Sequence, residues 1–197
     1  INGQSFLVTC PINRYSYALS NVKHPFSQHY CALQPKSALA RQLVQRLLEI
    51  KNKDQTCPPV YVRSDIIQGK GMASSSADIS VTAMATALAM DYNLSLKELE
   101  QICLSVEPTD ASFYQGVTQF DYIKGTISQP LGMCPPLKIL VFDEGGSIDT
   151  ITFNQQVNLQ AKILEKEPII RESLDLFKRG LHTHDINLIG QAATLSA

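Results

Sequence analysis

The sequence has no excess of charge of either sign. Its 197 residues include 17 lysines and arginines and 18 aspartates and glutamates, which give a formal net charge of −1. Proteins that bind nucleic acid or an anionic membrane surface usually carry a basic excess. The charge balance therefore argues against both kinds of partner.

The sequence lacks paired cysteines, and those present are widely spaced. The five residues are Cys10, Cys31, Cys57, Cys103 and Cys134. Their number is odd and no two form a C-x-x-C pair, so neither a disulfide framework nor a zinc site is indicated. We expect reduced, buried thiols in a cytosolic protein.

Long apolar runs are also missing. No stretch approaches the roughly 20 apolar residues that span a bilayer, and no signal peptide opens the chain, so we expect a cytoplasmic protein. The composition, 44% hydrophobic and 18% charged, is typical of a soluble globular protein with one or two domains. His182 and His184 lack a third ligand at useful spacing, and we interpret them as part of a solvated loop.

A stretch of small residues stands out near the middle of the chain. It reads Gly69, Lys70, Gly71, Met72, Ala73, Ser74, Ser75 and Ser76, and continues into an alanine-rich segment. Its spacing matches neither the phosphate loop G-x-x-x-x-G-K-[ST] nor the dinucleotide fingerprint G-x-G-x-x-G. A glycine loop before a helix still offers free backbone N–H groups and a positive dipole end to an anion. We predict a phosphate-binding loop.

Several side chains of this stretch have a second explanation. Ser74 and Ser76 fit helix capping as well as ligand binding. Lys70 fits either a contact with phosphate or a position in solvent. The helix that follows is dominated by small residues, so we expect it to pack closely against its neighbours and to lie inside the domain. One face is formed by Ala77, Val81, Met84, Ala85 and Leu88, and the rest is kept slim by Ala83, Ala87 and Ala89.

Other elements follow from periodicity and from turn residues. Strands are expected over residues 5–10, 15–19, 60–64 and 137–142. A helix over 37–50 places Leu39, Leu43, Leu47 and Ile50 on its apolar face. Ser95 and Glu98 form a capping box for a helix to about residue 104. Further helices are expected over 155–167, over 168–179 with Pro168 in the first turn, and from 186 onward.

The segment Glu107, Pro108, Thr109, Asp110 lies where the capping-box helix has to end, because a residue before proline avoids helical angles. Asp110 has two explanations. It could cap a helix over 111–115, or it could serve as a catalytic carboxylate beside the phosphate loop. Both alternatives stay open at this point.

The glycine loop resembles the second motif of the GHMP kinases, whose usual form is Gly-x-Gly-Leu-Gly-Ser-Ser-Ala. Met72 stands in place of Leu, Ala73 in place of the third Gly, and Ser76 in place of Ala. Residues 7–16, 69–75, 106–110 and 192–197 resemble, in order, segments of one branch, the L-threonine kinases of cobalamin biosynthesis.

This resemblance implies an α+β fold. Residues 1–134 would form a nucleotide-binding domain like the second domain of ribosomal protein S5, and residues 135–197 a truncated ferredoxin-like domain. The first and third family motifs are missing, and the chain opens at Ile1 without a methionine. We therefore expect a fragment of a longer protein. The oligomeric state does not follow from the sequence.

The resemblance also implies a function. The expected activity is ATP-dependent phosphorylation of the small molecule L-threonine to its O-3-phosphate; the alternatives are a homoserine- or mevalonate-type kinase and a non-catalytic nucleotide sensor. ATP would bind at residues 69–76, Mg²⁺ at Ser75 and Glu107, and Asp110 would accept the proton from the substrate hydroxyl.

Overall fold

The computed structural model describes residues 1, 4–20, 30–51, 57–143, 145–146 and 159–196. They form two compact units: Ile12–Phe113, here called the loop unit, and Ile1–Pro11 with Tyr114–Ala197, here called the terminal unit. The structure is mixed α and β, as predicted. The predicted family domains, residues 1–134 and 135–197, divide the chain elsewhere, and that assignment and their S5-like and ferredoxin-like folds remain predictions.

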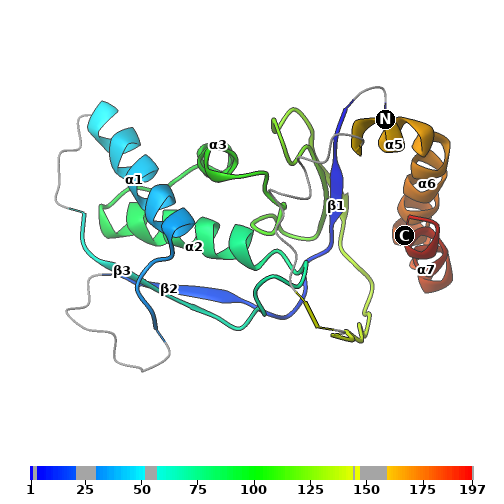
Figure 1. Ribbon diagram of the computed structural model, residues 1–197, viewed down its shortest axis with the longest axis horizontal. Helices are drawn as coiled ribbons and strands as arrows, with labels where there is room; N and C mark the ends of the chain where they lie inside the picture. The colour runs from blue at the N-terminus through cyan, green and yellow to red at the C-terminus, as the bar shows by residue number, and fades with distance from the viewer. Residues whose placement is uncertain (2–3, 21–29, 52–56, 144, 147–158, 197) are drawn as a thin grey trace. The chain divides into compact units, whose positions relative to one another are not determined.

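The loop unit is a two-stranded sheet covered by three helices. Its elements are β2 (Ser16–Ser20), α1 (Pro35–Ile50), β3 (Val60–Ser64), α2 (Ser74–Ala89) and α3 (Leu96–Val106). Strands β2 and β3 are antiparallel, with Ser16 opposite Ser64 and Ser20 opposite Val60. Helix α2 lies between this sheet and the pair α1 and α3 (Figure 1). Because both sides of α2 are covered, its side chains have to be small.

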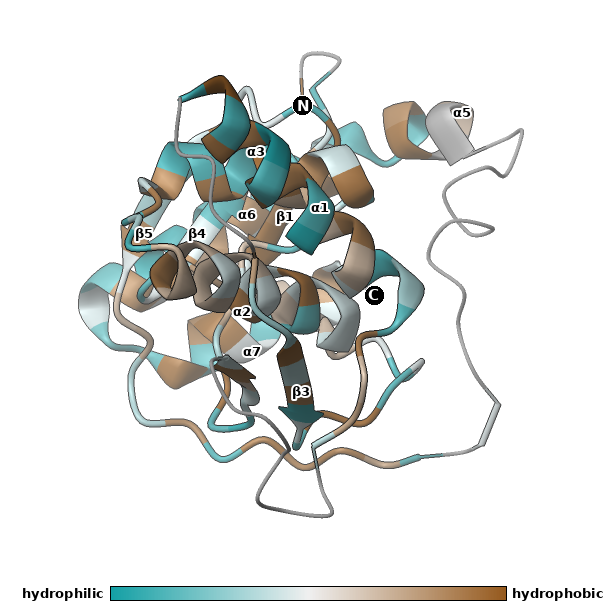
Figure 2. Cartoon of the chain, turned by 90° about the vertical axis from the view of Figure 1, so that its left-hand side faces the viewer, coloured by the Kyte–Doolittle hydropathy of each residue, from teal (hydrophilic) through white to brown (hydrophobic). Residues whose placement is uncertain are grey.

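The core of the loop unit is built from small and medium side chains of the three helices. Its buried members include Ala40, Val44, Leu48, Ile79, Ala83, Ala87, Leu99, Ile102 and Cys103. Helices α1 and α3 carry both apolar and polar segments, as expected for helices with one face in a core (Figure 2). Close packing of short side chains brings α1 and α3 near the backbone of α2.

Helix α2 also buries hydroxyl groups. The hydroxyl of Thr82 donates to the carbonyl of Asp78 at 2.7 Å, and that of Thr86 donates to the carbonyl of Thr82 at 2.7 Å. A buried hydroxyl without a partner costs free energy, and these bonds within the helix avoid that cost. The covered sides of the helix can therefore contain hydroxyl groups as well as apolar side chains.

The predicted apolar faces of α1 and α2 are only partly buried. In α1, Leu43 and Leu47 are half-buried and pack against the core as predicted, whereas Leu39 and Ile50 are exposed. In α2, Met84 and Leu88 of the predicted face are exposed, and Ile79, Ala83 and Ala87 are buried. The close packing expected of the small residues of α2 is present, but the most buried side chains lie on another face of the helix.

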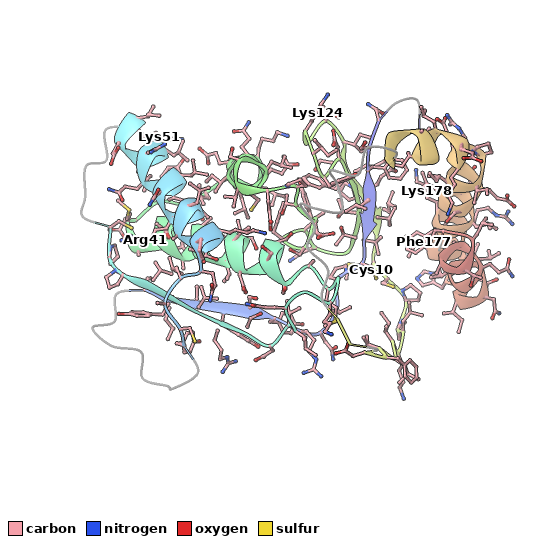
Figure 3. All side chains as sticks on the ribbon, in the orientation of Figure 1. Cys10, Arg41, Lys51, Lys124, Phe177 and Lys178 are labelled. Atoms are coloured by element: carbon pink, nitrogen blue, oxygen red, sulfur yellow. The ribbon has the colours of Figure 1, made fainter. Side chains whose placement is uncertain are left out.

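The terminal unit combines a three-stranded sheet with three helices. Its elements are β1 (Leu7–Thr9), β4 (Val117–Phe120), β5 (Ser128–Gly132), α5 (Leu159–Glu165), α6 (Glu167–Thr183) and α7 (Ile186–Leu195). The sheet is antiparallel in the order β1, β4, β5. Val117, Leu181 and Ile189 form its core, and Phe177 of α6, labelled in Figure 3, packs against them.

Helices α6 and α7 approach each other closely at Gly180. A Cβ atom at this position would lie 2.8 Å from Cγ1 of Ile189 and 3.0 Å from the carbonyl oxygen of Asp185, so only glycine fits. The carboxylate of Asp185 caps α7 by accepting from the N–H groups of Asn187 and Leu188. Pro168 lies in the first turn of α6, as predicted.

Two strands of the terminal unit were not predicted from the sequence. In β4 all four residues are buried, including the polar Thr118 and Gln119, so no alternation marks the strand. In β5, Pro130 and Gly132 are unfavourable strand residues, which are tolerated because β5 lies at an edge of the sheet.

The strand predicted over residues 137–142 does not form in the described structure. Leu140 and Phe142 of this segment are exposed. Its apolar and β-branched residues indicate strand propensity, but a strand also needs a partner to share its backbone hydrogen bonds, and no described strand pairs with it.

The cysteines and histidines carry no metal cluster or disulfide within the described residues. All five cysteines are free thiols; Cys57 and Cys103 are buried as expected, whereas Cys31 is exposed. His182 and His184 are exposed at the end of α6, and His182 lies in its last turn rather than in a loop. None of the helices in the described part of the chain has the length and apolar character of a membrane span.

The predicted capping box of α3 is confirmed. The hydroxyl of Ser95 accepts from the N–H of Glu98, and the carboxylate of Glu98 accepts from the N–H of Ser95. We expect Ser95→Ala to lower the free energy of unfolding by about 1 kcal/mol, because it leaves backbone donors without a partner. Urea unfolding measures the change.

Ser105→Ala is the matched control on the same helix. The exposed Ser105 hydroxyl donates to the carbonyl of Gln101 inside the helix, so its removal should leave stability unchanged or slightly raised. Equal losses for both variants would contradict the capping explanation.

Candidate phosphate-binding site

The glycine loop has an unusual backbone. Gly69 and Gly71 each have φ of 70°, and Ala73 has φ of 57°, whereas the residues between them do not have positive φ. Positive φ at every second residue bends the loop sharply just before the N-terminus of α2. Tight turns of this kind at a helix start are common in loops that bind anions.

Ala73 is the N-cap of α2, and no side chain caps this helix. Ser74, Ser75 and Ser76 are the first three residues of the helix rather than its cap, so the capping explanation for Ser74 and Ser76 was wrong. The backbone N–H groups of a first turn have no partner within the helix. Together with the positive end of the helix dipole, they add to the anion-binding character of the loop.

The predicted residues Ser76 and Asp110 come together although 34 positions separate them. The hydroxyl of Ser76 lies 3.5 Å from Oδ2 of Asp110 as a donor and accepts from the N–H of Asp110 at 3.1 Å. Residues 111–115 form turns and no helix. The helix-capping explanation of Asp110 was therefore wrong, because its carboxylate is oriented to α2 instead.

The environment of Asp110 favours the protonated acid. Burial raises the pKa of its carboxyl group above the ordinary value; the hydrogen bond from Ser76 opposes this effect, and the nearby negative charge of Glu107 adds to it. A carboxylate with a raised pKa beside a helix N-terminus is a candidate for proton transfer. The role of Asp110 as a base remains a prediction.

Glu107 already has a cationic partner. Its carboxylate, with a side chain 4% exposed, forms an ion pair with the ammonium group of Lys36, whose side chain is 43% exposed. Lys36 lies in the first turn of α1, directly after Pro35. Sequence reasoning missed Lys36, since a single lysine far from the loop carries no signal of its own.

The donor chemistry fits a magnesium ion. Ser75 and Glu107 offer a hydroxyl and a carboxylate oxygen, and Mg²⁺ prefers oxygen ligands while taking only one or two of them from the protein. For Glu107 to bind the metal, its ion pair with Lys36 would have to break. No cluster of three acidic, histidine or cysteine side chains suited to a metal occurs among the described residues. Ser75 and Glu107 remain predicted ligands.

The opposite side of α2 carries a second buried carboxylate that the sequence did not single out. Asp78 accepts a hydrogen bond from the hydroxyl of Ser16 at 2.5 Å, and Ser16 lies 2.8 Å from the hydroxyl of Ser64. Burial raises the pKa of Asp78, and hydrogen bonds from the two serines oppose the rise. These contacts join β2 and β3 to the first turns of α2 and hold the loop's helix on the sheet.

The remaining predicted loop residues differ in exposure. Ser74 is buried, Gly71 is exposed, and Gly69, Lys70, Met72 and Ser75 are half-buried. A Cβ atom on Gly71 would have no neighbour within 4 Å, so its positive φ rather than close packing requires glycine there. Lys70 is half-buried, so it does not lie fully in solvent. A contact between Lys70 and phosphate remains a prediction.

Comparison with known families identifies the class to which this site is similar. Residues 37–116 match the N-terminal domain of the GHMP kinases. The match includes the glycine loop, α2, Glu107 and Asp110, whereas Lys36 lies just before it. The resemblance to GHMP kinases inferred from the motifs is confirmed.

Two curated relatives narrow the comparison. The chain is 31% identical over 208 aligned residues to an L-threonine kinase of Salmonella typhimurium and 28% identical over 200 to an L-threonine kinase of Citrobacter freundii. Both alignments cover the whole chain, which spans 64% and 67% of the length of these relatives. No solved structure matches the chain significantly.

Ala73 gives a test of the loop's backbone. The left-handed conformation costs a residue with a Cβ atom about 1 kcal/mol of free energy. We expect Ala73→Gly to raise the free energy of unfolding by up to about 1 kcal/mol, because glycine adopts positive φ without a steric penalty. Thermal and urea unfolding measure the change.

Ala77→Gly, one turn later in the same helix, is the matched control. Ala77 has helical backbone angles, so glycine should lower stability there by about 1 kcal/mol. A loss of stability at both positions would contradict the left-handed conformation of Ala73.

Because the pKa of Asp110 is raised in the folded protein, we expect its replacement by asparagine to increase stability by an amount that depends on pH. A carboxyl group whose folded pKa lies above its unfolded value, 3.8 for aspartate, stabilises the fold at low pH, and this contribution is lost as the pH rises through the folded pKa. Asp110→Asn should therefore be more stable than the wild type at pH 7.5. The difference should shrink as the pH falls toward 4. Urea unfolding at a series of pH values measures it.

Asp121→Asn is a control for which the expected change in stability has the opposite sign. Burial alone would raise the pKa of Asp121, but hydrogen bonds from Thr126, Lys124 and Ile123 outweigh burial and lower it. Its replacement should lower stability, more at pH 7.5 than at pH 4. An Asp110→Asn protein that is less stable than the wild type at pH 7.5 would disprove the prediction for Asp110.

Proposed function

We propose that the chain carries the nucleotide-binding part of an ATP-dependent kinase that phosphorylates a hydroxyl group of a small molecule. One observation supports this most strongly: the glycine loop, with positive φ at Gly69, Gly71 and Ala73, leads into α2, and the first turn of α2 holds Asp110 through Ser76. Phosphoryl transfer needs a bound phosphate next to a group that positions the attacking hydroxyl and accepts its proton. The loop and Asp110 supply these two parts.

The proposed reaction moves one phosphoryl group. The hydroxyl oxygen of the substrate forms a bond to the γ-phosphorus of ATP, the bond from that phosphorus to the bridging oxygen breaks, and ADP leaves. The hydroxyl proton goes to the carboxylate of Asp110. Ser76 keeps this carboxylate oriented, and burial makes it a better proton acceptor than an exposed aspartate.

Mg²⁺ would neutralise charge on the β- and γ-phosphate oxygens, the usual contribution of a metal to this chemistry. In the proposal Ser75 and Glu107 hold it, and the N-terminus of α2 with residues 69–76 holds the phosphates. The chain's own residues then position three things: the nucleotide, the metal and the acceptor hydroxyl.

The proposed substrate is L-threonine, converted to its O-3-phosphate. The support is the name of the two relatives, which are L-threonine kinases, together with the motif resemblance along the chain. As part of the same proposal, the product serves cobalamin biosynthesis and the reaction takes place in the cytoplasm, where ATP is available.

A panel of alcohols tests the proposed function. The full-length protein is incubated with Mg²⁺ and ATP and with L-threonine, homoserine or mevalonate, and the release of ADP is measured. We expect turnover with L-threonine to exceed that with the other two by at least tenfold. Asp110→Asn should lower kcat by roughly 10²–10⁴, the usual contribution of a general base, without weakening ATP binding.

Three outcomes contradict parts of the proposal. Equal rates with all three alcohols would disprove the substrate. Binding of ATP without turnover of any alcohol would favour a nucleotide sensor. Full turnover by Asp110→Asn would remove Asp110 from the chemistry.

A further inference from the structure

The ion pair between Lys36 and Glu107 lies among the predicted catalytic groups. Glu107 is nearly completely buried and raises the pKa of Asp110, so the two carboxylates are electrostatically coupled. The ammonium group of Lys36 pairs with the buried carboxylate while much of its side chain stays exposed. The partly exposed ammonium group of Lys36 thus compensates the charge of a buried carboxylate in the loop unit.

The charges of this site oppose the ligand of the proposed function. A nucleotide triphosphate is strongly anionic, and Glu107 and Asp110 would repel it. The end of a helix supplies about half an elementary charge, which does not offset two carboxylates. A cation that contacts the phosphates is therefore expected when a nucleotide binds.

Lys36 is able to change partners without movement of the backbone. Its main chain is held in the first turn of α1, where the N–H of Ala38 donates to the carbonyl of Gln34 at 2.8 Å. Its four-carbon side chain has several rotatable bonds and three donors on the ammonium group. A rotamer change moves the charge from Glu107 to a ligand on the solvent side.

We propose that Lys36 is a phosphate-binding residue, which pairs with Glu107 when no nucleotide is bound and transfers its ammonium group to the phosphates of the nucleotide. This inference depends on the proposed function. The transfer frees the carboxylate of Glu107 at the moment when a metal would arrive with the nucleotide. Lys36 thereby couples nucleotide binding to the availability of Glu107.

The test measures ATP binding by calorimetry in the presence of EDTA, so that no metal contributes. Glu107→Gln should bind ATP several-fold more tightly than the wild type, because it removes a negative charge and releases Lys36. In the Glu107→Gln background, Lys36→Met should weaken ATP binding roughly tenfold or more, the effect of one hydrogen bond to a charged group. Lys36→Arg in the same background should retain most of the affinity.

The double variant separates binding from structure. Lys36→Met alone leaves Glu107 buried and unpaired, which destabilises the fold. Lys36→Met with Glu107→Gln has no unpaired charge, so its unfolding midpoint should match that of Glu107→Gln. Affinity that falls while the midpoint stays constant supports contact with phosphate.

Lys97→Met is the matched control. Lys97 is exposed and pairs at 2.7 Å with the buried Glu100, seven positions before Glu107. The substitution removes the same kind of ion pair from the same unit, and ATP affinity should stay within twofold of the wild type.

Two outcomes overturn the inference. If the wild type binds ATP and the double variant binds it as tightly as Glu107→Gln, Lys36 does not contact phosphate, while the proposed function is unaffected. If the wild type binds no ATP, in EDTA or with Mg²⁺, the proposed function fails and this inference fails with it.

Discussion

The burial of α2 on both sides is the constraint on which the loop unit depends. The helix has the sheet of β2 and β3 on one side and helices α1 and α3 on the other. It fits there because most of the side chains that face these neighbours are small and its buried hydroxyls bond to its own backbone. Close packing on both sides holds the helix in place through many contacts. Its first turn carries backbone N–H groups without partners within the helix, which is the property an anion site needs.

Charge inside the loop unit is distributed around this first turn. Asp110 and Glu107 lie on the α3 side and Asp78 on the sheet side, and burial raises the pKa of both aspartates. Three acids near a loop suited to anions oppose binding unless a cation or a proton compensates them. The ion pair of Glu107 with Lys36 provides one compensation. Among the described residues, the other two carboxyl groups have no cationic partner of this kind, and burial shifts them toward the neutral acid.

Sequence reasoning succeeded where the cause is local. The capping box of Ser95 and Glu98 and the glycine loop before α2 depend on neighbours in the chain, and both are present as predicted. It failed where the cause is distant. The pairing of β4 and β5, the exposure of Met84 and the contact of Lys36 with Glu107 depend on which segments meet in space, and residue types alone do not contain that information. The contact of Ser76 with Asp110 lies between these cases, because a motif resemblance named both residues without indicating that they touch.

The left-handed alanine at the start of α2 also has a consequence for how this sequence evolves. An alanine codon becomes a glycine codon by one base change, so relief of the strain at Ala73 is always within mutational reach. Glycine would, however, give the loop more backbone states to lose when a ligand orders it. Alanine therefore gives up some resistance to unfolding and leaves the loop with fewer backbone conformations.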